Sequence, residues 1–264
     1  MEKYLKNVYN VYKNYSRKDD FYLGPRLTPM DNENPKYLIL GINPSNSYAP
    51  HAEFSKEICD DLREISVLND QEERQRRFND FLSFKNYEQN REYVCKLQEL
   101  AHIHHNHFEK HKDFAEKLGL SKEHYAFFDL FPLWEIEQEA LLDKLEGHPK
   151  LEKELLDEFF EFIDRNKSIE ELLFFNAGAY KKFSNYLEPY IFQKQEKKHR
   201  IPMKHQKKNV NWNVFESSVL LKGGQKIKVW GYGLGGVRYL KERDKETTAL
   251  ASRFKHKFAY NGLE

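Results

Sequence analysis

Cysteine is scarce in this sequence, and long apolar runs are missing. The 264 residues include only two cysteines, Cys59 and Cys95, which form no metal-binding or disulfide pattern. So few cysteines are typical of a reducing compartment, and we expect a cytoplasmic protein. No run approaches the roughly 20 apolar residues of a membrane-spanning helix, and the first residues lack the apolar core of a signal peptide. We therefore expect no membrane association.

An excess of one charge sign is also missing. Lys and Arg number 43 against 42 Asp and Glu, so the net charge is +1 and no overall field draws the chain to a polyanion. Charged residues still make up 32% of the chain and the mean hydropathy is −0.85, which predicts a soluble, helix-rich protein. Aromatic residues reach 15%, enough to fill a core and to stack on bases.

Signatures of several enzyme classes are absent as well. The glycine-rich run at 231–236 lacks the lysine of a nucleotide-triphosphatase loop, and no G-x-S-x-G marks a serine hydrolase. The histidines between residues 102 and 111 lie outside any H-E-x-x-H pattern, so they favour a surface helix over a metal site. We expect no metal and no cofactor.

Four short apolar segments are present, and each has the length of a buried strand. Because helices separate them, they favour a mostly parallel sheet covered by helices. We predict an α/β fold with three layers, α/β/α, around a four-stranded, mostly parallel sheet in one domain, residues 1–264. The predicted strands are 37–42, 125–129, 172–176 and 225–230, the last forming a β-hairpin with 212–221.

The other segments are predicted to be helical or irregular. A charged helical insert is expected at about 70–118, and the basic segment 193–208 is expected to be irregular. Helix is expected where apolar residues recur at a spacing of three to four. The predicted helices cover residues 1–18, 52–68, two stretches within 71–118, 135–146, 149–166, 179–187 and 240–258.

The strand at 37–42 leads into the most distinctive stretch of the chain. Gly41 allows a close backbone approach, and Pro44 disfavours a helix at Asn43, so a polar loop follows. Two other predicted strands end in a polar residue, Asp129 and Asn176. The carboxyl ends of parallel strands share one edge of the sheet, where open α/β sheets bind ligands, so we expect a pocket there.

The stretch Gly41-Ile42-Asn43-Pro44-Ser45 resembles the first active-site motif of the uracil-DNA glycosylase superfamily, closest to its mismatch-specific and single-strand-selective branches. Residues 174–182 resemble the family's third strand and helix start, and residues 127–132 lie where its second strand ends in a base-reading Asn. The resemblance implies a DNA repair enzyme that flips a base out of DNA and hydrolyses its N-glycosidic bond without a cofactor.

The last motif of the family is replaced in this sequence. The family has His-Pro-Ser or Asn-Pro-Ser after its fourth strand, whereas residues 231–238 are Gly-Tyr-Gly-Leu-Gly-Gly-Val-Arg, with no histidine to stabilise the departing base. By resemblance, we expect this loop to enter a nucleic-acid groove. Tyr232 or Leu234 would be a wedge, and Arg238 would meet a phosphate or the leaving base.

Two residues are the catalytic candidates. The resemblance implies that Asn43 positions the attacking water; alternatively, Asn43 only hydrogen-bonds its own loop. Asp129 stands in place of the base-reading Asn. An ionised Asp only accepts hydrogen bonds, so it suits an exocyclic amine and predicts a cytosine derivative rather than uracil. The alternative is that Asp129 caps a helix starting near Leu133.

Substrate-binding candidates surround these two residues. Tyr48 or Phe54 is expected to stack on the base, although Phe54 equally suits a core position. Asn176 is expected to contact the sugar or the base, or to cap the following helix. The other candidates are Gly41, Ile42, Pro44, Ser45 and Arg238.

Basic residues concentrate in the segment 193–208. Such a run is ordinarily a solvated surface, but Trp212 follows it and the rest of the chain is balanced in charge, so we expect contacts with DNA phosphates. The candidates are Lys197, Lys198, Arg200, Lys204, Lys207 and Lys208.

The sequence thus favours a monomeric, cytoplasmic DNA glycosylase-like hydrolase acting on a modified or unusual base in single- or double-stranded DNA. A non-catalytic member of the same fold that binds nucleic acid or a protein is the alternative. A third class, an unrelated α/β enzyme of small molecules, predicts a closed pocket and no continuous basic groove.

Overall fold

The computed structural model describes residues 2–17, 32, 34–42, 70, 72, 73, 76, 106–133, 138–205, 208–233 and 244–259. The chain forms two compact units, and each combines segments that are far apart in the sequence. One unit contains Met1–Pro29, Ile42–His104 and Asp129–Phe162, and the other contains Met30–Gly41, His105–Phe128 and Ile163–Glu264.

The first unit contains helices that the sequence predicts. The ring of Tyr4 lies 5.0 Å from that of Phe162, and Asn7 Nδ2 donates a hydrogen bond to Glu158 Oε2 at 2.7 Å. Apolar residues at helical spacing therefore pack the first helix against a later one, as the periodicity predicts. The helices are α1 (Glu2–Asn14), α7 (Gln138–Glu146) and most of α8 (Pro149–Arg165).

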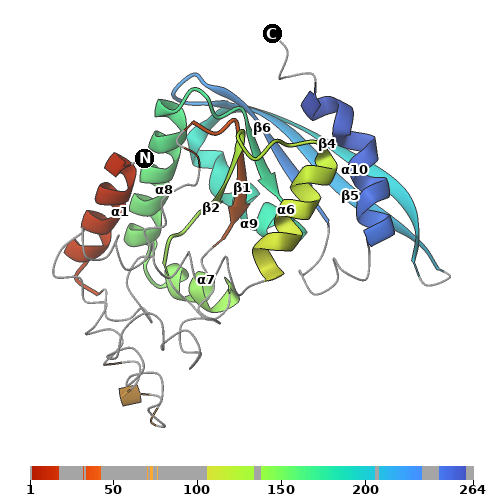
Figure 1. Cartoon of the computed structure of the whole chain (residues 1–264). Coiled ribbons are helices and arrows are strands. Elements are labelled where there is room, and N and C mark those ends of the chain that lie inside the picture. The colour runs from red at the N-terminus through yellow and green to blue at the C-terminus, as the bar shows by residue number, and fades with distance from the viewer. Residues whose placement is uncertain are drawn as a thin grey trace. The chain divides into compact units, whose positions relative to one another are not determined.

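The second unit is built on a six-stranded mixed sheet, in the order β2-β1-β3-β6-β5-β4 (Figure 1). β1 pairs in parallel with β3, and β3 pairs in parallel with β6. β5 pairs antiparallel with both β6 and β4. The strands are β1 (Tyr37–Gly41), β2 (Tyr125–Asp129), β3 (Glu171–Phe174), β4 (Ile191–His205), β5 (Lys208–Leu221) and β6 (Lys226–Tyr232).

The α/β class and the predicted hairpin are confirmed, but two details of the predicted sheet are wrong. The sheet has six strands rather than four, and its β5 and β4 run antiparallel to their neighbours. The basic segment 193–208, expected to be irregular, belongs mainly to β4. β4 is an edge strand of the sheet. Lysines are common on such strands because they hinder pairing with other chains. The resulting polar sequence lacks the apolar pattern by which a buried strand is predicted.

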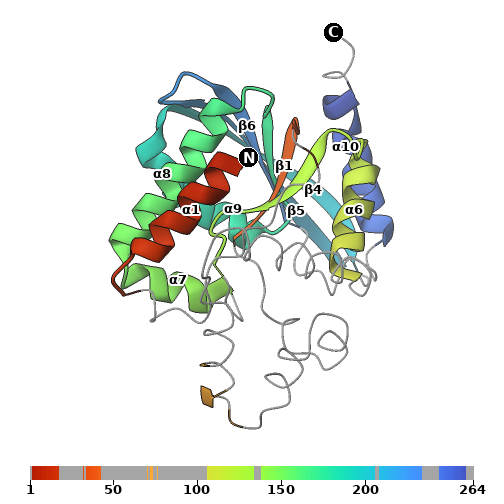
Figure 2. The same cartoon turned by 60° about the vertical axis from the view of Figure 1, so that its left-hand side comes forward.

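Aromatic side chains fill the sheet face beneath α6 (Asn106–Leu118) and α10 (Asp244–Ala259). These two helices lie side by side in both views of the molecule (Figures 1 and 2). Phe114 of α6 stands edge-on to Phe175 and Tyr232, and Phe254 of α10 stands edge-on to Trp230. Such T-shaped pairs add to the stabilisation from burial.

The opposite face of the sheet is covered by α9 (Ala177–Leu187), so helices lie on both faces. Tyr180 of α9 stacks on Phe215 of β5, with ring centroids 5.1 Å apart. The backbone of Gly231 in β6 passes under the same ring, because a Cβ there would lie 2.4 Å from Tyr180 Cγ. Glycine is thus required for this close approach of helix and sheet.

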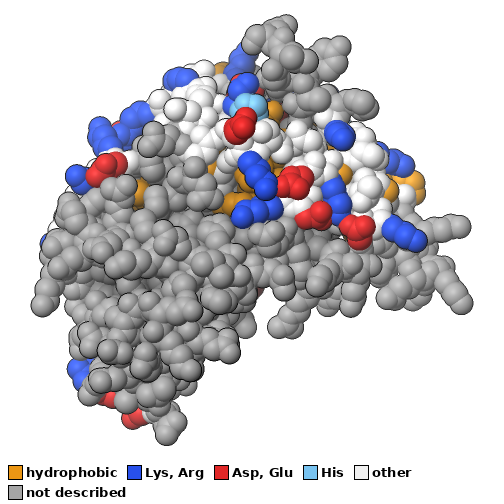
Figure 3. Space-filling model, in the orientation of Figure 1, with side chains coloured by type: hydrophobic (Ala, Val, Ile, Leu, Met, Phe, Trp, Pro, Cys, Tyr) orange, Lys and Arg blue, Asp and Glu red, His pale blue; other side chains and the backbone are white. Residues whose placement is uncertain are grey.

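The surface carries both charge signs. Figure 3 shows Lys and Arg side chains interspersed with Asp and Glu over the described part of the face that it presents. Among the helices that the structure describes, none has the length and apolar character needed to cross a membrane.

Candidate functional site

The sheet has a topological switch point between β1 and β3. From β1 the chain continues to β2 on one side, whereas β3 lies on the other side of β1 and is followed outward by β6. Parallel sheets bind ligands outside the carboxyl ends of the strands at such a point. The residues there in the second unit are Gly41, which ends β1, and Asn176, which follows β3.

The resembling motif begins at this edge. Gly41 is half-buried and Ile42 is buried, and the carbonyl of Ile42 accepts a hydrogen bond of 2.8 Å from the backbone N–H of Phe131. This bond lies within the first unit and joins the chain after β1 to the chain after β2. The other candidates from this motif and its loop lie outside the described residues: Asn43, Pro44, Ser45, Tyr48 and Phe54.

Asp129 ends β2 as predicted, and it is half-buried. The helix that it was expected to cap does not begin near Leu133, because Leu133 forms a β-bridge and the next helix begins at Gln138. Burial, together with the negative charges of Asp129 and Glu158, raises the pKa of the Tyr4 hydroxyl. The carboxylate of Asp129 therefore acts on the interior of the first unit, and its role as a base-reading group stays a prediction.

Asn176 caps α9, as one of its two expected roles requires. Its Oδ1 accepts a hydrogen bond of 2.7 Å from the backbone N–H of Gly178. The residue is exposed, and its Nδ2 group has no hydrogen-bond partner in the part of the chain that the structure describes. Capping therefore leaves two donors on the solvent side, and substrate contact stays a prediction.

The predicted wedge residue Tyr232 is fully buried, so that role is wrong. Gly231 and Tyr232 complete β6 instead of starting a loop, and the Tyr232 ring packs 5.5 Å from Phe114 and 5.9 Å from Phe254. Glycine-rich sequence suggested a loop, whereas pairing with β3 and β5 continues the strand. The other residues assigned to this loop, Leu234 and Arg238, lie outside the described residues.

The basic candidates lie on the β4–β5 hairpin rather than on a loop. Lys197, Lys198 and Arg200 are exposed, and the alternation of a strand places Lys197 on the opposite face from the other two. Lys198 Nζ lies 5.5 Å from the ring centroid of Phe215. Lys204 and Lys208 belong to the hairpin near its tip, with side chains outside the described part, and Lys207 lies outside it altogether.

A histidine that the sequence analysis assigned to a surface helix lies near the carboxyl edge of the sheet. The half-buried His111 of α6 has its ring centroid 5.4 Å from that of Phe175 and 6.2 Å from that of Phe127. Phe127 is the middle residue of β2, and Phe175 directly follows β3. The available signal was helical spacing, since His111 precedes Phe114, Ala115 and Leu118 on the buried stripe.

No cluster of three or more metal-binding side chains occurs in the regions that the structure describes. No protein-family model, curated protein or solved structure matches the chain.

Proposed function

We propose that the protein is a DNA glycosylase-like hydrolase of the uracil-DNA glycosylase fold, acting on a modified or unusual base. The observation that carries the proposal is the hydrogen bond from Phe131 N–H to the Ile42 carbonyl. The bond joins Ile42, the residue before Asn43, to Phe131, two residues after Asp129. The two catalytic candidates are therefore each close in sequence to one partner of this hydrogen bond. The switch point beside Gly41 supports a ligand site at the carboxyl edge of the sheet in the second unit.

The proposed reaction is hydrolysis of the bond between C1′ of the sugar and the base nitrogen. That bond breaks with its electron pair moving to the base, and a water positioned by Asn43 forms the new C1′–O bond. The proton that this water loses is taken up by the departing base anion, so that the products are a C1′ hydroxyl and a neutral base. Asp129 accepts a hydrogen bond from an exocyclic amine, which favours a cytosine derivative. The protein must hold the base outside the helix during the reaction, because the bond is inaccessible in stacked DNA.

The direct test measures abasic sites in oligonucleotides that carry uracil, mismatches or modified cytosines. We expect abasic sites with a modified cytosine, their loss in Asn43→Ala and a changed base preference in Asp129→Asn. The matched control is Asn10→Ala, an exposed Asn on α1. Activity that persists in Asn43→Ala would contradict the role of Asn43, and inactivity of the wild type on every base would contradict the enzyme.

The alternative is a protein of the same fold that binds nucleic acid without cleaving it, and the β4–β5 hairpin favours it. Within the described residues, the part of β5 before Val214 pairs with β4 alone, so residues 200–205 and 208–213 form a two-stranded hairpin end. Lysines near its tip would reach phosphates, and each neutralised phosphate steepens the dependence of affinity on salt.

The alternative is tested by charge reversal on β4, with Lys197, Lys198 and Arg200 changed to Glu. We expect weaker DNA binding and a shallower salt dependence, measured by fluorescence anisotropy. The matched control reverses three other exposed lysines, Lys122, Lys150 and Lys153, and so changes the net charge equally. An equal loss of binding in both variants would show a general charge effect and no role for the hairpin.

A further inference from the structure

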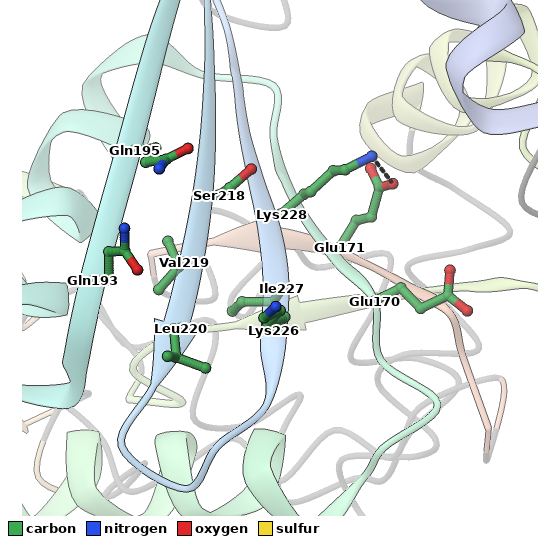
Figure 4. A pocket seen from close by; sticks show the side chains of 10 residues that line it. All are labelled: Glu170, Glu171, Gln193, Gln195, Ser218, Val219, Leu220, Lys226, Ile227 and Lys228. Carbon is green, nitrogen blue, oxygen red and sulfur yellow. Dashed lines mark ion pairs between the residues drawn. The ribbon is translucent and has the colours of Figure 1, made fainter.

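A row of polar side chains crosses the face of the sheet that carries α6 and α10. The registers place Glu171 of β3 beside Lys228 of β6, Lys228 beside Ser218 of β5, and Ser218 beside Gln195 of β4. Residues paired in this way project on the same face, so the four side chains form one transverse row. Figure 4 shows Lys228 reaching along this row toward Glu171.

The row borders a hollow of about 440 Å³, here called the Glu171 groove. Lys226 and Lys228 of β6 lie on one side of it, and Gln193 and Gln195 of β4 lie on the other (Figure 4). Between them β5 contributes the short side chain of Ser218. Because two strand spacings separate β6 from β4, the walls stand about 10 Å apart, a width that suits a small molecule.

Hydrogen-bond donors line the part of this groove formed by β4, β5 and β6, whereas the carboxylates of Glu170 and Glu171 line its β3 end. Its two ammonium groups, two carboxamides and one hydroxyl all donate, and the ammonium groups only donate. Lys226 is exposed, and the side chain of Lys228 is 41% exposed, so both can turn toward a bound molecule. Two lysines with flanking amide donors are the complement of a compact, doubly charged oxyanion.

A buried carboxylate sits at the end of the row. The side chain of Glu171 is 2% exposed, with Oε2 accepting 2.6 Å from Trp230 Nε1 and Oε1 3.8 Å from Lys228 Nζ. Burial raises the pKa of Glu171, and the charges of Glu170 and Glu216 add to the rise. Lys228 and the hydrogen bond from Trp230 oppose it, and the resulting pKa is about 7. The other charged or titratable groups on this face of the surrounding strands are Tyr37, Lys226 and Tyr232, with Lys36 beside Glu170 and both His199 and Lys197 beside Glu216.

We propose that the Glu171 groove binds a small molecule carrying a phosphate monoester, and that Glu171 takes up a proton when the ligand binds. The ester's doubly charged group would lie between Lys226 and Lys228, with its polar remainder against Gln193, Gln195 and Ser218. An oxyanion that engages Lys228 removes the cation nearest to Glu171. A buried carboxylate without a cation favours its neutral form, and the neutral form does not repel the ligand.

This site is independent of base excision, because all its residues belong to β3–β6 and the turn before β3. Anion binding and proton uptake are linked, so affinity must rise as the pH falls through the titration of Glu171. A phosphate monoester itself titrates near pH 6, whereas sulfate keeps both charges from pH 6 to pH 8. Sulfate is therefore the probe for the proton linkage, and glycerol phosphate is the probe for the ester.

The experiment is calorimetric titration of the full chain with both probes at constant ionic strength. We expect sulfate to bind about tenfold more tightly at pH 6 than at pH 8, because Glu171 would be protonated in the complex. Glu171→Gln should bind at pH 8 as tightly as the wild type does at pH 6, with no pH dependence. Lys226→Met and Lys228→Met should each weaken binding at least tenfold, and Lys222→Met, an exposed lysine of the β5–β6 turn, is the matched control.

Several results would overturn the proposal. Equal binding by Lys226→Met and Lys222→Met would show that the ions bind elsewhere. A pH dependence that survives in Glu171→Gln would exclude Glu171 as the proton acceptor. If neither probe binds, and an oligonucleotide binds the wild type but not Lys226→Met, the lysines belong to a nucleic-acid surface instead. Since Lys226 is exposed, its variant tests the groove even where the Lys228 variant fails to fold.

Discussion

Replacing Glu171 by Gln should raise the free energy of unfolding relative to that of the wild type, and this gain should be larger at alkaline pH than at acid pH. In the folded protein the pKa of Glu171 is raised from 4.5 to about 7, mainly by burial. Between these values the folded state keeps a proton that the unfolded state has lost. The stability that this proton contributes is therefore full below pH 4.5 and disappears as the pH rises through 7.

The magnitude follows from that difference in pKa. Each pH unit is worth about 1.4 kcal/mol, so the wild type should lose about 3 kcal/mol between pH 4.5 and pH 8 through this group alone. Gln does not ionise and avoids this loss. Its Oε1 still accepts the hydrogen bond from Trp230, and any cost of its amide group is independent of pH.

Urea unfolding of both proteins from pH 4.5 to pH 8 measures this effect. The difference in unfolding free energy should move by about 3 kcal/mol in favour of Glu171→Gln across this range. The matched control is Glu188→Gln, because Glu188 is exposed and is not among the charges that act on Glu171, so this substitution should not reproduce the shift. A wild type and variant that differ by the same amount at every pH would refute the reasoning.

Three further substitutions test the packing around the sheet edge by urea unfolding. Asn176→Ala removes the cap of α9 and should cost about 1 kcal/mol, which Asn176→Ser should largely restore; equal stability of Ala and Ser would contradict the cap. Gly231→Ala places a Cβ 2.4 Å from Tyr180 Cγ and should cost more than about 2 kcal/mol, whereas a neutral effect would show that helix and sheet are not in this contact. Tyr180→Phe removes hydrogen bonds of 2.7 Å to Glu196 Oε2 and 2.9 Å to Ser217 Oγ and should cost about 1–3 kcal/mol, with no loss contradicting a buried network.

The buried strands could be predicted because burial on both faces leaves a continuous apolar run. β1 and β3 are of this kind, with Leu38 and Leu172 fully buried. The β5–β6 hairpin was predicted from Lys222-Gly223-Gly224, and Gly224 has the positive φ of +86° that favours glycine. Amphipathic spacing likewise predicted α1 and α8.

β4 could not be predicted because its side chains are mostly exposed and therefore show no buried-strand pattern, although its partner β5 follows it directly in the sequence. Burial of Tyr232 was missed for a related reason. Glycines on both sides of it suggested a loop, but backbone pairing of Gly231 with Phe174 and Phe215 extends β6. In both cases the sheet's hydrogen bonding overrode the local preference of the residues.

The Glu171 groove was also beyond the sequence. Glu171 merely preceded an apolar run, and Lys228 lies in another strand far along the chain. Only the register of β3 against β6 brings them together, and only burial makes the carboxylate unusual. More could be predicted for the proposed catalytic site than for this groove. Residue patterns alone located the end of β1 at Gly41 and the end of β2 at Asp129.

The most direct test of the central proposal is single-turnover release of free base from DNA containing modified cytosines, detected by mass spectrometry. The account predicts that the wild type and Asn10→Ala release a base with an exocyclic amine and leave an abasic site, and that Asn43→Ala releases none. Release that is unchanged in Asn43→Ala, or no release of any base by the wild type, would contradict it.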